Sequence, residues 1–202
     1  MANIVLIGAS GNGGSRILAE LSARGHTVTA IARNPDKIAA LPGVTALKGD
    51  VFDQAGLTAL LKGHDVVISA VHFTASDPQT LLGAVRASGV PRYVVMGGAG
   101  SLLVDGKPIV EGADFPAAYK EEAQKGAAYL ALLKTVTDLD WTFLSPSAVI
   151  FPGERTGIFR LGKDDLLIGA DGSKISFEDF AVALVDEIET PAHIRQRFTV
   201  GY

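Results

Sequence analysis

The 202-residue sequence contains no cysteine, which excludes disulfide bonds, thiolate metal sites and a cysteine nucleophile. It also has no excess of positive charge: 18 Lys and Arg residues stand against 22 Asp and Glu residues, for a formal net charge of −4. A chain of this sign has no overall attraction for a phosphate backbone. We therefore expect its partner to be a small molecule and not a nucleic acid.

Long apolar runs are missing as well. The apolar stretch at residues 1–7 ends at Gly8 and has no basic flank, unlike a secretory signal. No window approaches the roughly 18 uninterrupted apolar residues that indicate a membrane span. No two His or acidic residues have the spacing of metal ligands. These absences predict a cytoplasmic protein with no membrane partner and no bound metal.

Hydrophobic residues make up 48% of the chain, and short β-branched runs alternate with longer amphipathic segments. Strands are predicted at residues 3–7, 27–32, 44–48, 65–70, 92–96 and 141–145, and helices at 15–24, 35–41, 54–62, 79–88 and 117–137. Apolar strands separated by helices are typical of parallel strands buried on both faces. The sequence thus predicts an α/β fold, a Rossmann-like doubly wound parallel sheet.

The pattern changes after Pro146. Residues 151–176 are rich in Gly and charge and include Asp171-Gly172, which favours a hairpin turn. Ser176 and the acidic residues after it predict a helix to about Glu189, and a last strand is expected at 198–200. We interpret residues 1–202 as one domain. Roughly residues 147–202 form a small substrate-side lobe over the carboxyl edge of the sheet.

Three glycines follow the first predicted strand with the spacing G-x-x-G-x-x-G. Gly8 permits a tight turn, Gly11 lets the backbone approach a diphosphate, and Gly14 lets the helix pack closely on the strand. The start of the helix offers free N–H groups and a partial positive charge to phosphates. An ordinary glycine-rich turn would not need this spacing. We therefore predict that the cofactor is bound by Gly8, Ser10, Gly11, Asn12, Gly13 and Gly14.

The second predicted strand ends without the acidic residue that binds the ribose 2′-hydroxyl of NAD. Arg33 stands there instead, and a guanidinium can pair with a 2′-phosphate and stack on adenine. The position favours NADP(H) over NAD(H). The alternative is a solvated Arg at a helix start, which is also common and would leave NAD(H) possible as the cofactor.

Further cofactor contacts are predicted at the ends of the later strands. Asp50 could hold the adenine amino group and Val51 could line the ring, with a helix cap as the alternative role of Asp50. Ala70 and Val71 follow the fourth strand, where the ribose and diphosphate would run, and Pro146 ends the sixth strand beside the nicotinamide.

Several sequence segments resemble those of the NAD(P)H-binding, NmrA-like group of atypical short-chain dehydrogenases/reductases. They are Gly8–Gly14, Gly49–Val51, Asp65–Ala70 and Trp141–Pro146. Sequence segments in the C-terminal part of the chain are similar to the NADH-flavin reductase branch of that group, and this branch itself resembles biliverdin reductase B. These are Pro152–Gly157, Arg160–Gly162, Ile175–Ala181 and Arg195–Val200. The resemblance covers essentially the whole chain and implies a reductase that uses NAD(P)H.

Classical members of the superfamily use a Tyr-x-x-x-Lys pair, in which the Lys lowers the pKa of the Tyr. Here Tyr119 is followed at the fourth position by Ala123, and the adjacent Lys120 would project about 100° away around a helix. Standard alcohol–ketone chemistry is therefore not expected. The candidate catalytic residues are Tyr119 and His72, the latter because an imidazole is a common proton donor in enzymes and this one follows the fourth strand.

These observations predict an NADPH-preferring oxidoreductase that passes hydride to a flat, delocalised acceptor such as a flavin or quinone. Such a reaction needs stacking and proximity more than a fixed acid. A non-catalytic regulator that senses NADP(H) is the alternative. A nucleotide-sugar epimerase or dehydratase is less favoured, because the chain lacks a large substrate domain. The sequence leaves the oligomeric state open between monomer and homodimer.

Overall fold

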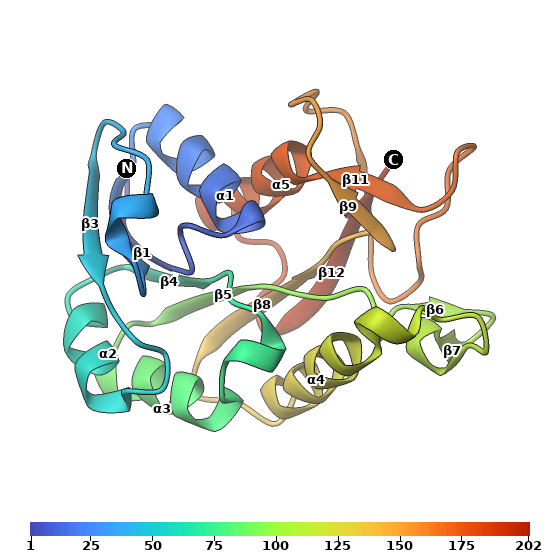
Figure 1. Ribbon diagram of the computed structural model, residues 1–202, viewed down its shortest axis with the longest axis horizontal. Helices are drawn as coiled ribbons and strands as arrows, with labels where there is room; N and C mark the ends of the chain where they lie inside the picture. The colour runs from blue at the N-terminus through green and yellow to red at the C-terminus, as the bar shows by residue number, and fades with distance from the viewer.

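Eight strands form the central sheet in the computed structural model of the chain, which describes all residues 1–202 (Figure 1). Their order is β10-β12-β8-β5-β4-β1-β2-β3, and all run parallel except β10, which pairs antiparallel with β12. The bounds are β1 Asn3–Ile7, β2 Thr27–Ala32, β3 Val44–Lys48, β4 Val66–Ser69, β5 Arg92–Met96, β8 Asp140–Ser145, β10 Arg160–Gly162 and β12 Gln196–Gly201. The predicted doubly wound α/β fold is confirmed.

Five helices cover the two faces of the sheet: α1 Asn12–Ala23 and α5 Phe177–Glu189 lie on one side, and α2 Gln54–Leu61, α3 Pro78–Ser88 and α4 Ala117–Leu133 lie on the other (Figure 1). Successive residues of a strand point to opposite faces, so each strand contributes to both sides. Ile4 and Leu6 belong to the core under α1 and α5, while Val5 and Ile7 belong to the core under α2, α3 and α4. Burial on both faces explains why the strands are continuously apolar.

Three helices differ from the sequence prediction. The helix predicted at residues 35–41 is wrong: only the 3₁₀ turn η1 Pro35–Lys37 forms there, because the backbone is already extended at Ile38. The first helix begins at Asn12 and not at residue 15, because Gly11 is its N-cap and Asn12 to Gly14 form its first turn. The long helix α4 ends at Leu133 and not near residue 137. Beyond it, the indole N–H of Trp141 donates to the carbonyl of Val136 at 3.2 Å, which holds this segment in a turn. β-branched residues there also favour leaving the helix.

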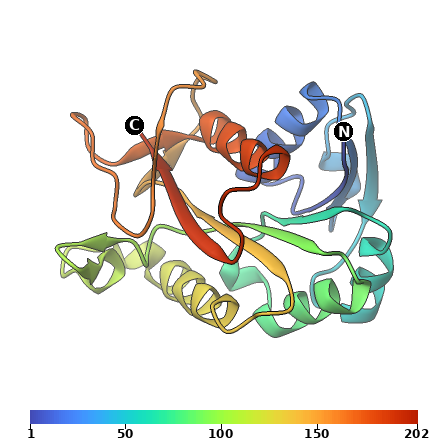
Figure 2. The ribbon, with the colours of Figure 1, turned by 180° about the vertical axis from the view of Figure 1, so that it is seen from behind.

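The C-terminal region, predicted as a lobe, is divided between two places. Helix α5 packs beside α1, and β12 lies next to β8 within the main sheet, as Figure 2 shows from behind. The intervening segment forms a separate parallel pair, β9 Val149–Phe151 with β11 Lys174–Ser176. The turn at Asp171-Gly172 precedes β11, with Gly172 at φ 90°. Ser176 caps α5 by accepting from the amide of Asp179 at 3.0 Å, as predicted.

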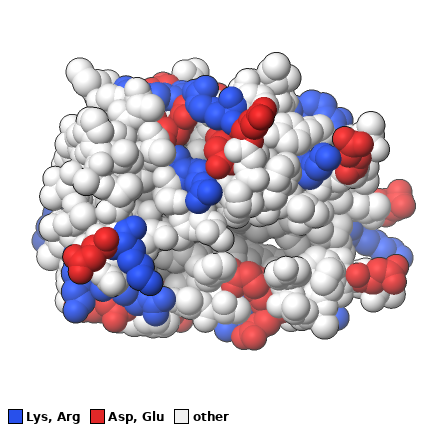
Figure 3. All heavy atoms as spheres, turned by 45° about the horizontal axis from the view of Figure 1, so that its top comes forward, with Lys and Arg blue, Asp and Glu red and all other residues white.

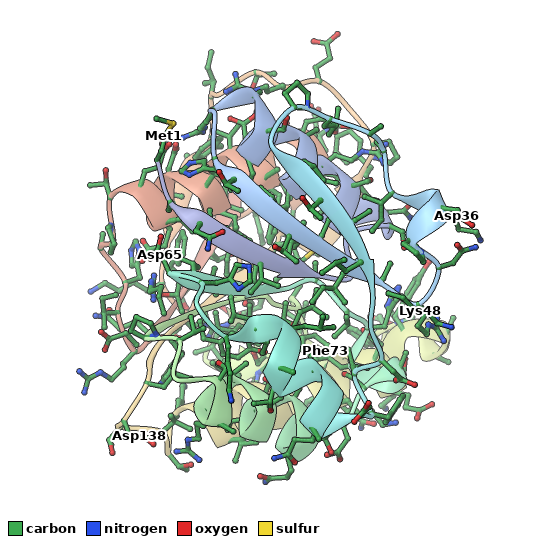
Figure 4. The ribbon with its side chains drawn as sticks, turned by 90° about the vertical axis from the view of Figure 1, so that its left-hand side faces the viewer. Met1, Asp36, Lys48, Asp65, Phe73 and Asp138 are labelled. Atoms are coloured by element: carbon green, nitrogen blue, oxygen red, sulfur yellow. The ribbon has the colours of Figure 1, made fainter.

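Short elements complete the chain: the hairpin β6 Leu103–Val104 with β7 Lys107–Pro108, and the 3₁₀ turns η1 Pro35–Lys37, η2 Phe73–Ala75 and η3 Ile109–Glu111. None of the helices combines the length and the apolar composition that crossing a membrane requires. The strand order reverses between β1 and β4, and in such sheets ligands bind outside the carboxyl ends of the strands at this position. Figure 4 shows this edge, with Lys48 at the end of β3 and Asp36 just after β2, opposite Met1 and Asp65.

Candidate functional site

The loop from β1 to α1 is built on two glycines that accept no side chain. Gly8 has φ 85°, and a Cβ on it would lie 2.6 Å from the carbonyl oxygen of Ala70. A Cβ on Gly14 would collide with the carbonyl oxygen of Gly8. The amide of Gly8 donates to the carbonyl of Ile31 at 2.9 Å. These contacts seat the start of α1 tightly between the ends of β1, β2 and β4.

Gly11 differs from these two glycines. Its backbone is in an ordinary region, and a Cβ on it would meet nothing closer than the carbonyl oxygen of Gly8 at 3.4 Å. No side chain caps α1, and the amides of Asn12 and Gly13 have no hydrogen-bond partner in the chain. These amides and the helix dipole form a site suited to an anion. The fold therefore does not require a glycine at position 11, and the space beside Gly11 is open.

A pocket of about 150 Å³ adjoins this loop. It is lined by Ile7, Gly8, Ser10, Gly11, Ile31, Ala32, Arg33, Gly49, Val51, Ala70, Val71, His72 and Ala75. The structure thus brings together eight predicted residues from the ends of four parallel strands, namely Gly8, Ser10, Gly11, Arg33, Val51, Ala70, Val71 and His72. Their cofactor contacts stay predictions, but their placement at the carboxyl ends is that of a nucleotide site.

Other predicted residues do not line the pocket: Asn12, Gly13, Gly14, Asp50 and Pro146. Gly13 and Gly14 are buried in the first turn of α1, and Pro146 is buried after β8. Asp50 is exposed and accepts from the amide of Phe52 at 3.0 Å. The alternative role of Asp50 as a helix cap is wrong, because Asp53 caps α2 by accepting from the amide of Gly56.

Arg33 is the cation of this pocket. Its side chain is exposed, and no ion pair or side-chain hydrogen bond joins it to the rest of the chain. On the face drawn in Figure 3, Lys and Arg are interspersed with Asp and Glu, and a hollow opens near the middle. No broad field of one sign covers that face. A charged ligand would therefore be attracted by local groups such as Arg33 and not by the surface as a whole.

His72 is paired with a residue that the sequence analysis did not single out. Its Nδ1 lies 3.2 Å from Oε1 of Glu122 in α4, while 81% of its side chain is exposed. Glu122 also accepts from the amides of Phe73 and Thr74, each at 2.8 Å, and from the hydroxyl of Thr74 at 2.7 Å. Burial alone raises the pKa of Glu122, but these hydrogen bonds and the charge of His72 bring it below its ordinary value.

Tyr119 lies apart from the pocket. It is 66% exposed in the first turn of α4 and makes no side-chain hydrogen bond. Ala123, at the position of the absent Lys, packs against the backbone at Gly100, where an added Cβ would lie 2.7 Å from the Ala123 Cβ. The structure therefore contains no Tyr–Lys pair. Among its His, Asp and Glu side chains, no group of three or more is arranged to hold a metal ion.

A larger pocket of about 210 Å³ lies between α5 and the edge strands, near Phe159, Leu161 and His193. It is away from the strand ends that carry the glycine loop. Two of its carboxylates, Asp186 and Glu189, are already paired with Arg24 at 2.7 Å each. Nothing in this pocket points to the chemistry of the main site.

An open helix N-terminus at the point where the strand order of a parallel sheet reverses defines a dinucleotide-binding protein of the Rossmann type. The chain belongs to the NAD(P)H-binding family, which it matches over residues 8–191. It has the oxidoreductase-type NAD(P)-binding fold.

The chain is similar to relatives of nearly equal length. The chain is 39% identical to the uncharacterised protein YwnB of Bacillus subtilis, covering 98% of this chain and 97% of the relative. A solved structure from Bacteroides thetaiotaomicron, provisionally named an epimerase, has 38% identity, a TM-score of 0.94 and coverage of 100% and 97%. One from Streptococcus pneumoniae, provisionally named an NADH-flavin reductase, has 34% identity, a TM-score of 0.86 and coverage of 100% and 99%.

Proposed function

We propose that this protein is an NADPH-preferring reductase of a flat, delocalised acceptor such as a flavin or a quinone. The observation that carries the proposal is the pairing, in one pocket, of an uncapped α1 N-terminus with the free guanidinium of Arg33. The first is suited to a diphosphate and the second to a 2′-phosphate. Membership of the NAD(P)H-binding family supports the same ligand class.

The residues present fit the nucleotide. The room left at Gly11 and the unpaired amides of Asn12 and Gly13 would accommodate a diphosphate. Ile31 and Val51 supply apolar surface for an adenine ring, with Arg33 at the rim. Once bound, the reduced nicotinamide supplies a hydride. The chain's own part is then to bind, to orient and to admit the acceptor.

The choice of a flat acceptor rests on what the site offers. No Tyr–Lys pair is present to protonate the oxygen of a simple ketone. A delocalised ring spreads the incoming charge, so stacking and proximity contribute more to its reduction than a fixed acid does. The provisional name of the Streptococcus pneumoniae relative supports this class of acceptor.

The test is a turnover assay with purified protein, in which NADPH oxidation is followed with FMN or a quinone as acceptor. We expect turnover by the wild type and its loss in Gly11→Val, which fills the space at the loop. Ala19→Val, on the exposed side of α1, serves as the control and should stay active. Tight NADPH binding without turnover on any acceptor would instead support a nucleotide-sensing regulator.

A further inference from the structure

We propose that Glu122 is a positioning residue that holds the imidazole of His72 by its Nδ1–H and leaves Nε2 free at the nucleotide pocket as a proton donor. The proposal deepens the reductase function above and depends on it. The observation behind it is the contact of 3.2 Å between His72 Nδ1 and Glu122 Oε1 at the mouth of the pocket.

The other partners of Glu122 determine which atom carries the proton. Two amides and one hydroxyl of Phe73 and Thr74 occupy both carboxylate oxygens, and the amides can only donate. The carboxylate is therefore ionised and accepts from every neighbour, in agreement with its lowered pKa. The imidazole must then donate from Nδ1. In the neutral ring this leaves Nε2 as the acceptor, and in the charged ring Nε2 carries the second proton.

The backbone around His72 is held firmly enough for such a role. The next residue, Phe73, is buried, and its ring lies 6.1 Å from that of Phe143 and 5.9 Å from that of Tyr129. Glu122, which like Tyr129 lies in α4, binds the same turn through the amides of Phe73 and Thr74. Two elements, the β8 strand and the α4 helix, therefore place the imidazole before any ligand arrives, which is the arrangement that efficient proton transfer needs.

No other charged group contacts the imidazole. Glu121, the next residue of α4, pairs with Lys125 at 2.9 Å. Asp77, from the loop leading into α3, caps that helix by accepting from the amide of Thr80. Tyr119, one turn before Glu122, makes no side-chain hydrogen bond. Arg33 lines the same pocket but makes no ion pair or side-chain hydrogen bond, so Glu122 is the charged group that contacts the imidazole.

The proposed step is balanced. The acceptor takes a hydride, with its electron pair, from the reduced nicotinamide and one proton from Nε2 of the His72 imidazolium. A new bond to hydrogen would form at each of two acceptor atoms, while two bonds would break: the C–H bond of the reduced nicotinamide, which supplies the hydride, and the Nε2–H bond of His72, which supplies the proton. The neutral imidazole would keep its proton on Nδ1, hydrogen-bonded to Glu122, and Nε2 would regain a proton from solvent.

The first experiment reads the tautomer directly in the nucleotide-free protein, through nitrogen-15 NMR of the imidazole. We expect the neutral His72 ring to carry its proton on Nδ1 in the wild type. In Glu122→Gln this preference should be lost, whereas Glu121→Gln, which removes the same charge one residue away, should keep it. A wild-type ring protonated on Nε2, or a tautomer unchanged in Glu122→Gln, would overturn the proposal. The wild-type spectrum alone tests the predicted tautomer, even if Glu122→Gln folds poorly.

The second experiment is a double-mutant cycle on turnover. His72→Gln should lower kcat about 100-fold, the lower end for loss of a general acid, without changing NADPH affinity. Glu122→Gln should lower kcat about tenfold and shift its pH profile, and it should have no further effect in the His72→Gln background. A role limited to holding the turn would lower turnover equally in both backgrounds and contradict the proposal. Absence of turnover in the wild type would refute the reductase function but leave the tautomer result standing.

Discussion

The guanidinium of Arg155 forms two hydrogen bonds of 2.7 Å to the carboxylate of Glu20, joining positions 135 residues apart. Glu20 lies in α1, the helix whose other end borders the nucleotide pocket, and its side chain is 6% exposed. The same segment is tied to α5, where Asp179 accepts from the amide of Gly157 at 2.7 Å. The segment around Arg155 thus connects the C-terminal region to α1, the helix that follows the glycine loop.

Replacing Glu20 with Gln should lower the free energy of unfolding by about 1 kcal/mol near pH 7, because the buried carboxylate loses its charge-assisted bonds to Arg155, whose side chain is 56% exposed. The bonds from Arg155 lower the pKa of Glu20, and this effect, with the bond from Arg24, outweighs the burial that raises it. A lowered pKa gives stability that is present above the ordinary value of 4.5 and is lost as pH falls through the folded-state value.

Urea unfolding of wild type and Glu20→Gln at a series of pH values checks this. The gap between the two proteins should narrow as the pH falls below 4.5. Glu121→Gln, from an exposed pair with Lys125, is the control and should change stability by less than about 1 kcal/mol at any pH. A gap that does not depend on pH would contradict the role given to the ion pair.

Gly14→Ala should destabilise the fold, whereas Gly11→Ala should not. A methyl group on Gly14 collides with the Gly8 carbonyl, while one on Gly11 makes ordinary contact at 3.4 Å. Overpacking of this kind lowers the free energy of unfolding by about 1–3 kcal/mol. Thermal unfolding of both variants measures the difference. Equal stability of the two variants would show that the close packing of Gly14 on the Gly8 carbonyl does not limit the side chain at position 14.

The sequence was sufficient to predict the fold because its signals are local. Apolar strands, helix periodicity and the glycine spacing each lie within a few residues, and β1 and β2 have the predicted bounds. The boundary errors are local too: Gly11 acts as an N-cap without a capping side chain, so the usual Ser, Thr, Asp or Asn signal was absent.

The partner of His72 could not be predicted in the same way. Glu122 lies 50 residues away along the chain, and only the packing of α4 against η2 brings the two together. In the sequence it is one of two adjacent glutamates on a predicted helix, and nothing local distinguishes it from Glu121. The pairing of Arg155 with Glu20 escaped for the same reason. Long-range polar contacts depend on the assembled fold and leave no spacing pattern.

Arg33→Ala should weaken NADPH binding by about 1–3 kcal/mol and leave NADH binding nearly unchanged, because a guanidinium bound to a 2′-phosphate has no counterpart in NADH. Calorimetric titration with each nucleotide measures the two affinities. Lys37→Ala is the control, since Lys37 is exposed, unpaired and close to the same strand end but does not line the pocket. Equal losses for both nucleotides would refute the selectivity assigned to Arg33.

The hydroxyls of Tyr93 and Tyr129 lie 2.7 Å apart in the core under α4, so removing both should lower the free energy of unfolding by less than the sum of the two single removals. Burial raises the pKa of Tyr93 to about 12 and that of Tyr129 well above its ordinary value. The neutral forms are therefore favoured by folding, so this contribution to stability is complete below about pH 10 and is lost as the pH rises through the folded-state values.

Tyr129→Phe leaves a buried hydroxyl with a missing partner and should lower the free energy of unfolding by about 1–3 kcal/mol. The double variant Tyr93→Phe, Tyr129→Phe should lose less than the sum of the single changes and should unfold at a higher pH than the wild type. Urea unfolding at neutral pH and an alkaline unfolding titration measure both effects, and strict additivity of the two substitutions would show that the hydroxyls do not depend on each other.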